Sequence, residues 1–281
     1  PESALNKEIA LTVKYIESDN ASGATATTNV TVTAVARVEK DSTTTYVGAL
    51  ADAFTEGNSG ATVTLLSEVD LGSNYIGIRG SSTFTLDLNG QTVKASHYDA
   101  FDISGGSLTI QDSGTGGKIE SSNITIEVTG GTLSVQSGTV SGYCGVEISG
   151  GTVAISGDAV ISGGDTGLRV TGAGKATLSG GTFSGTAAIT ANNYGSVTLK
   201  NLLAEGYAYH RNNLPVTKAE GWVDSNTWGE VSLDTKATLT GTVTVKKCNH
   251  TGEGVCEYTP NEGAETHAMT CLACGYAGAA E

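Results

Sequence analysis

The stretch GGTLSVQSGTVSGYCGVEIS at residues 130–149 decides the fold, because the chain repeats it with small changes on both sides. Related copies occupy residues 105–129, 150–171 and 172–191. Each copy contains two triplets in which apolar residues flank a middle residue, and a lone apolar residue lies between the triplets. A period of about 20 to 25 residues with three short strands per copy is typical of a solenoid.

Alignment of the triplets extends the repeat from Val63 to Tyr209 and predicts about seven coils. Because side chains alternate across a strand, the outer residues of each triplet point inward and the middle residue points to solvent. Each buried Val, Ile or Leu stabilises such a stack by about 1.5 to 3 kcal/mol. The first column of triplets comprises residues 63–65, 86–88, 108–110, 133–135, 153–155, 176–178 and 197–199, and the third comprises 76–78, 101–103, 126–128, 146–148, 168–170, 187–189 and 207–209.

Composition agrees with a turn-rich β fold and restricts the partners. The 281 residues include 39 glycines but only 3 prolines, and the glycines lack the strict period of collagen. The formal net charge is −14, so we expect no nucleic-acid partner, because phosphates require a basic surface. We expect no membrane insertion, because no run of about 18 apolar residues occurs. Pro1 opens the chain, so we expect a fragment of a longer precursor.

The segments that flank the repeat differ from it. Residues 1–40 contain two alternating runs, IALTVKY and NVTVTAVARV, which predict a β-hairpin that can be the end of a truncated immunoglobulin-like sandwich domain. Residues 41–60 place apolar residues at helical spacing and predict a short helix that caps the first coil. We expect the solenoid over residues 61–247, closed by further strands, and a separate tail over residues 248–281.

Several phrases of the chain resemble a known class of protein. The segments YVGALADAF, ATVTLLSEVDL and FTLDLNGQTV, together with the GGT-rich coils, resemble the right-handed parallel β-helix, of the pectate-lyase-like class, found in large bacterial surface proteins. The resemblance covers about Thr45 to Lys247 and implies an all-β, right-handed single-stranded parallel β-helix with three short strands per coil. It also implies an extracellular or cell-wall location. Separately, we expect the chain to be a monomer. It leaves activity open, because one fold hosts many functions.

A row of acidic residues is the first candidate for chemistry. The middle positions of the third column hold Asp102, Glu127 and Glu147, followed by Arg169 on the next coil. Coils about 4.8 Å apart would align the three carboxylates on one face. Such a row can bind Ca²⁺, or it can supply the carboxyl pair of a retaining glycosidase. A solvated charge ladder, partly neutralised by Arg169, explains the same pattern.

Aromatic residues late in the repeat are a second candidate. Tyr194, Trp222 and Trp228 lie in an asparagine-rich part of the chain, and sugar rings stack on such side chains. They predict a glycan site. The alternative is that aromatic residues plug the C-terminal end of the core, where they supply large apolar area.

The tail carries the third candidate, a Cys-x-His pair followed about twenty residues later by a Cys-x-x-Cys pair. This is the ligand spacing of a small zinc ribbon, and it resembles short Cys/His repeats near the ends of such surface proteins. A tail this short cannot bury a core, so a structural Zn²⁺ ion or disulfides must hold it together, and the histidines favour zinc. The expected ligands are Cys248, His250, Cys271 and Cys274, with Cys256 and His267 as contenders.

Three functions fit this pattern. The leading hypothesis is a non-catalytic extracellular or cell-surface module for adhesion or glycan binding, in which a rigid β-helix displays a polar surface to a host or cell-surface ligand. The alternative is a polysaccharide-active hydrolase or lyase that uses the acidic row. A purely structural stalk without a ligand site is the third.

Overall fold

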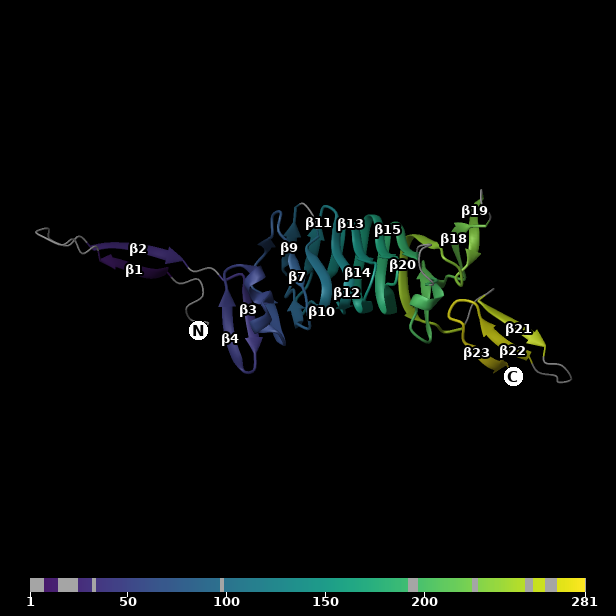
Figure 1. Cartoon of the computed structure of the whole chain (residues 1–281). Helices are drawn as coiled ribbons and strands as arrows, with labels where there is room; N and C mark the ends of the chain where they lie inside the picture. Colours follow the sequence, from purple (N-terminus) through teal and green to yellow (C-terminus); the bar gives the residue numbers. More distant parts are fainter. Residues whose placement is uncertain are drawn as a thin grey trace, which may run out of the picture.

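The computed structural model describes residues 8–14, 25–31, 34–96, 99–191, 197–223, 227–250, 255–260 and 267–280. Within these residues the chain is almost entirely β-structure, in sheets of 2, 18 and 3 strands. The 18-stranded sheet is a β-solenoid of about six turns, and its coils stack along one axis (Figure 1). The all-β solenoid predicted from the repeat is therefore confirmed.

The N-terminal segment forms a sheet of its own. β1 (Glu8–Lys14) pairs antiparallel with β2 (Thr25–Thr31), and Ile9 lies opposite Val30. The next strand, β3 (Ala36–Lys40), belongs to the solenoid instead.

The helix predicted over residues 41–60 does not form, and this prediction is wrong. β3 and β4 (Thr43–Val47) make an antiparallel hairpin, and β3 also pairs antiparallel with β5 (Ala61–Leu65), the first strand of the solenoid. The run of threonines in β4 explains the difference, because β-branched residues favour strands over helices.

Short 3-10 turns follow the hairpin and cover the first coil. They span Leu50–Phe54 and Glu56–Asn58. Leu50 and Phe54 are buried, and the Phe54 ring packs edge-on against Phe84, with 5.2 Å between ring centroids. The apolar residues that suggested a helix therefore do cap the core, but they do so from 3-10 geometry.

Most of the triplets are in the predicted register, but two are shifted by two residues. Leu86 lies opposite Ile110 and not opposite Leu108, and Leu168 lies opposite Ile189 and not opposite Ala187. Leu108 lies opposite Leu133, Leu133 opposite Val153, and Val153 opposite Ala176, all in parallel pairs. The outer residues of the triplets are buried and the middle residues are partly exposed. The strands after β5 are β6 (Val69–Asp70), β7 (Ile76–Ile78), β8 (Thr83–Asp87), β9 (Thr92–Ala95), β10 (Phe101–Gln111), β11 (Lys118–Ser121), β12 (Ile124–Val135), β13 (Thr139–Ile148), β14 (Thr152–Val170) and β15 (Lys175–Ala191).

Glycines stack at the corner between the third and the first column. Gly106, Gly131 and Gly151 have φ values of 61°, 65° and 69°, in the left-handed region that favours glycine. A Cβ on Gly131 would lie 2.5 Å from the carbonyl oxygen of Gly106 on the preceding coil. Each coil can therefore turn sharply on top of the previous one only without a side chain at this corner.

The seventh coil predicted at residues 197–199 and 207–209 does not continue the parallel stack. Residues 200–202 form a 3-10 turn, and β16 (Tyr207–Arg211) pairs antiparallel with β20 (Thr238–Lys247). β20 also pairs antiparallel with β15, so it covers the open edge of the last regular coil. An antiparallel strand protects an exposed edge that a further parallel coil would only reproduce.

A hairpin and a small sheet follow the last regular coil. β18 (Lys218–Trp222) pairs antiparallel with β19 (Trp228–Ser232) beside the closing strand β20, and a three-stranded antiparallel sheet lies near the C-terminus (Figure 1). No helix within the described ranges is long and apolar enough to span a membrane. The remaining strands are β17 (Leu214–Pro215), β21 (Cys256–Pro260), β22 (His267–Cys271) and β23 (Ala277–Ala280).

An introduced charge should lower the stability much more at one residue of a solenoid strand than at its neighbour. Ile155 is fully buried, whereas the adjacent Ala154 is partly exposed. We expect Ile155→Asp to lower the free energy of unfolding by more than about 4 kcal/mol, because it buries an unpaired carboxylate. Ala154→Asp should stay within about 1 kcal/mol of the wild type. Urea denaturation followed by circular dichroism measures both, and similar losses in the two variants would contradict the inward and outward assignment.

Candidate metal centre and acidic row

Two segments of chain supply the residues of the candidate metal centre. Cys248 directly follows the closing strand β20, and its backbone N–H donates to the Gly206 carbonyl at 2.8 Å. Cys271 ends β22, and Cys274 lies in the turn toward β23. In that turn the Gly275 N–H donates to the Cys271 carbonyl at 2.8 Å, and Gly275 has a φ of 78°. A tight turn of this kind directs both thiols of a Cys-x-x-Cys pair to one side.

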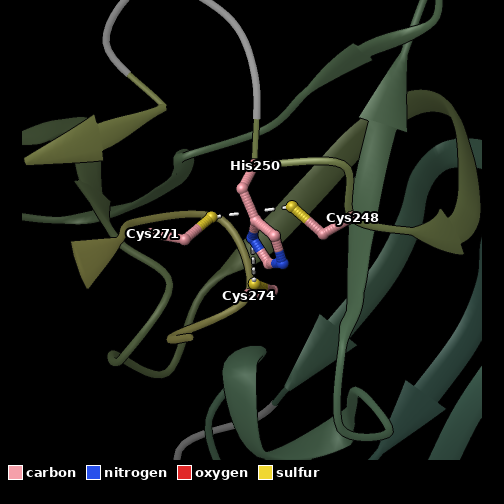
Figure 2. Close-up of side chains that lie close together, drawn as sticks. All are labelled: Cys248, His250, Cys271 and Cys274. Carbon is pink, nitrogen blue, oxygen red and sulfur yellow. Dashed lines mark hydrogen bonds between the residues drawn. The ribbon is translucent and has the colours of Figure 1, made fainter. Parts of the chain in front are cut away.

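The four side chains converge on one point (Figure 2). The ligand atoms of Cys248, His250, Cys271 and Cys274 all lie within 4.8 Å of one another. The Cys248 and Cys271 Sγ atoms are 3.5 Å apart, and the Cys274 Sγ is 3.5 Å from the His250 Nδ1. A tetrahedral ion with metal–sulfur bonds of about 2.3 Å needs ligand atoms about 3.8 Å apart. The cluster, which contains the four ligands expected from the sequence, can therefore hold a metal ion.

The thiols of the cluster differ in how readily they ionise. Burial by itself raises the pKa of the Cys271 thiol, but hydrogen bonds from His250 and from the Cys274 backbone lower that pKa to about 6. Burial raises the pKa of Cys274 to about 12, and it also raises the pKa of Cys248. Metals bind thiolates, so an incoming cation would expel the protons that the other two thiols hold.

The tail contacts the end of the solenoid at the cluster. Ala208 of β16 is buried together with Val255, Cys271 and Ala273. A Cβ on Gly275 would lie 2.7 Å from the Lys200 side chain, which comes from the 3-10 turn after the last regular coil. Ala208 was expected to point to solvent as the middle residue of a triplet, but the C-terminal sheet covers it.

Of the two contenders, Cys256 lies outside the ligand group. The Cys256 Sγ donates to the His250 carbonyl at 3.2 Å and lies beside the cluster. The side chain of His267 falls outside the described residues, so its role stays open. All five cysteines are free thiols, and Cys144 is a fully buried residue of β13 whose pKa burial raises to about 12.

The acidic row has the predicted register. Asp102 pairs with Glu127, Glu127 with Glu147, and Glu147 with Arg169 on successive coils. Ion pairs occupy both ends of the row. Arg169 Nη1 lies 3.0 Å from the Glu147 carboxylate, and Arg79 Nη2 lies 2.7 Å from the Asp102 carboxylate. Only Glu127 lies between these two ion-paired positions.

Asp99 is a functional candidate that the repeat pattern did not reveal. Burial, the negative charge of Glu127 and a hydrogen bond with Glu127 raise the pKa of Asp99 to about 6. Asp99 lies in the connection between β9 and β10, outside the triplets. The alternation of side chains predicts the direction of a residue only when that residue lies in a strand. Asp99 lies in a connection, so the sequence pattern could not place its carboxyl beside the row.

One groove of the solenoid lies away from the row. This shallow groove of about 620 Å³ follows the second column of strands. Its lining includes Lys94, Ser96, Glu120, Ser122 and the exposed ring of Tyr143, and none of the three carboxylates of the row. In the described residues, the acidic row thus does not line this groove.

The predicted aromatic site is only partly described. Trp228 on β19 is half exposed and pairs through its backbone with Trp222. The Trp222 side chain and all of Tyr194 lie outside the described residues. Tyr209 is fully buried, and its hydroxyl donates to the Leu199 carbonyl at 2.7 Å, so one late aromatic residue does plug the end of the core.

Comparison of the chain with known protein families, with curated proteins and with solved structures finds no match. The class of the protein is therefore defined by its architecture alone: a β-solenoid of about six turns with a C-terminal Cys/His cluster that can hold a metal ion.

Replacement of Asp99 should change stability in a pH-dependent way. Its folded-state pKa of about 6 exceeds the ordinary value of 3.8, so the folded state loses stability as pH rises through about 6. We expect Asp99→Asn to raise the melting temperature by on the order of 2 °C at pH 7.5, a value reduced by partial solvent screening, and by less near pH 4.5. The exposed Asp158→Asn is the control. An equal gain at both pH values would contradict the shifted pKa.

Proposed function

We propose that Cys248, His250, Cys271 and Cys274 bind one structural Zn²⁺ ion that fixes the C-terminal sheet to the closed end of the solenoid. The observation that carries this proposal is the origin of the ligands. Cys248 comes from the end of the closing strand β20, whereas Cys271 and Cys274 come from the C-terminal sheet. A bound ion would join the two parts directly.

The composition of the cluster favours zinc over other metals. Three thiolates and one imidazole are soft and borderline ligands, which suit a tetrahedral Zn²⁺ site, whereas Ca²⁺ and Mg²⁺ prefer oxygen. Four protein ligands fill the tetrahedron and leave no position for substrate, as in structural sites. The C-terminal sheet also needs such support, because its buried cluster comprises four of the described residues, one of them Ala208 of the solenoid.

For the solenoid we propose a non-catalytic role in adhesion or glycan binding, in an extracellular or cell-wall setting. The location rests on the resemblance to bacterial surface proteins. Two observations support the absence of catalysis. Arginines pair with both ends of the acidic row, and the groove beside Tyr143 contains none of its carboxylates. Trp228, whose side chain is half exposed, supports the glycan-binding role.

One observation favours an enzyme as the second candidate. Asp99 and Glu127 form a carboxyl pair, and the pKa of Asp99 is raised to about 6. A carboxyl with a raised pKa beside a second carboxyl is the arrangement that glycosidases use for general acid catalysis. In this alternative Asp99 would be the acid and Glu127 its partner. The same carboxyls and Glu147 are the oxygen ligands that a Ca²⁺ ion would use.

Zinc content tests the metal proposal. We expect the reduced, purified chain to contain about one zinc ion, and Cys274→Ser to weaken zinc binding by at least about 100-fold, because the site loses one of four ligands. Cys144→Ala, which removes a thiol remote from the cluster, should leave the zinc content unchanged. Elemental analysis and competition with a chromogenic chelator measure these effects. If the chain contains no stoichiometric zinc and its tail thiols are oxidised, the proposal is wrong.

A glycan panel tests the role of the solenoid. We expect the chain to bind at least one polysaccharide without releasing reducing ends, and Trp228→Ala to weaken that binding by about tenfold, because a stacked ring contributes about 1 kcal/mol or more. The exposed Tyr276→Ala is the matched control. Failure to bind any glycan would favour a stalk. Release of reducing ends that is lost in Glu127→Gln would favour the enzyme.

A further inference from the structure

We propose that Cys256 and Cys271 form an oxidation site: peroxide joins the two thiols in a disulfide, removes Cys271 from the metal and releases the ion. This inference rests on the zinc site proposed above. It assigns a role to the one cysteine of the tail that lies outside the ligand group.

The strand register brings the two cysteines face to face. Cys256 of β21 lies directly opposite Cys271 of β22 in an antiparallel pair. The Leu272 N–H donates to the Val255 carbonyl at 2.8 Å, whereas the Cys271 N–H donates away from β21, to Tyr276 at 2.8 Å. Cys256 and Cys271 are therefore a non-hydrogen-bonded pair.

Such a pair suits a disulfide. The Cα atoms of non-hydrogen-bonded partners lie about 4.5 Å apart, with side chains on the same face. Disulfides span Cα separations of about 4.4 to 6.8 Å. The register thus allows an S–S bond between Cys256 and Cys271 with little movement of the backbone.

The side chains already lie together, and their surroundings differ. The Cys256 thiol interacts with the Cys271 thiol and donates to the His250 carbonyl at 3.2 Å. Cys256 is partly exposed, whereas Cys271 is fully buried. Cys256 is not a ligand, so a bound ion would leave its thiol available for reaction.

The chemistry balances with hydrogen peroxide as the oxidant. Peroxide transfers one oxygen to a thiol of the pair, which becomes a sulfenic acid, and one water leaves. The sulfur of the second thiol then attacks the sulfenic sulfur, the S–S bond forms, and the hydroxyl group leaves as a second water. In the zinc-loaded chain Cys271 would be a thiolate, so one proton from solvent completes the second water. One thiol and one thiolate then become a disulfide, and one peroxide is reduced to two waters.

The disulfide would open the metal centre and keep the sheet intact. Cys271 would no longer be a thiolate, so the ion would lose one of its four ligands. The Cys271 and Cys248 Sγ atoms, now 3.5 Å apart, would then no longer share a metal ion. The new bond would instead lock β21 to β22. Oxidation would therefore exchange a link between the sheet and the solenoid for a link within the sheet.

The test treats the whole 281-residue chain, zinc-loaded and reduced, with hydrogen peroxide. Peptide mapping by mass spectrometry identifies the disulfide, and a chromogenic chelator follows zinc release. We expect Cys256–Cys271 to be the main disulfide and to appear in step with released zinc. Cys256→Ser should keep its zinc when reduced, but release it about tenfold more slowly under peroxide. Cys144→Ala should release zinc at the wild-type rate.

Two results would overturn the inference. One is a main disulfide between other cysteines, such as Cys248 with Cys271 or Cys271 with Cys274. The other is zinc release from Cys256→Ser at the wild-type rate. If the reduced chain binds no zinc, the metal proposal fails by itself, and the peptide map still decides whether Cys256 pairs with Cys271.

Discussion

Every coil of the solenoid buries its apolar residues against the coils above and below it, and the rest of the structure depends on this stacking. Parallel strands place Leu133 over Leu108 and under Val153, so one short triplet contributes to a continuous core. The close approach of successive coils also explains the corner glycines, where a Cβ on Gly131 would meet the backbone of the coil before it. The stack is stable only where each coil has a neighbour on both sides.

The two ends of the stack lack such neighbours, and different devices cover them. At the first coil, β3 pairs antiparallel with β5, and Phe54 packs over the apolar residues at this end of the core. At the last coil, β20 runs antiparallel to β15, and Tyr209 fills the end of the core. The metal centre follows directly from this closure, because Cys248 is the residue after β20. Among the described residues, Val255, Cys271 and Ala273 of the tail are buried together with Ala208 of the solenoid, beside the Cys/His cluster.

Stacking also sets the electrostatics of the surface. Residues at equivalent positions of successive coils must lie side by side, which brings Glu127 next to Glu147. Like charges so close would repel, and the chain offsets this with Arg169 at one end of the row and Arg79 at the other. The position of Asp99 beside Glu127 raises its pKa, and this carboxyl holds its proton more tightly than an exposed aspartate.

The sequence by itself determined the columns of the solenoid and the ligands of the cluster. Side-chain alternation is a local property of a strand, so it assigns Ile148 to the core, and the spacing from Cys248 to Cys274 is a local signature too. Only the tertiary structure decided which way strands pair. Alternation is the same in parallel and antiparallel strands, so it wrongly predicted a seventh coil. Helical spacing wrongly predicted a capping helix over residues 41–60, where the chain forms β4 and short 3-10 turns. The placement of Arg79, Asp99 and Cys256 depended on contacts between distant segments, for which no local pattern exists.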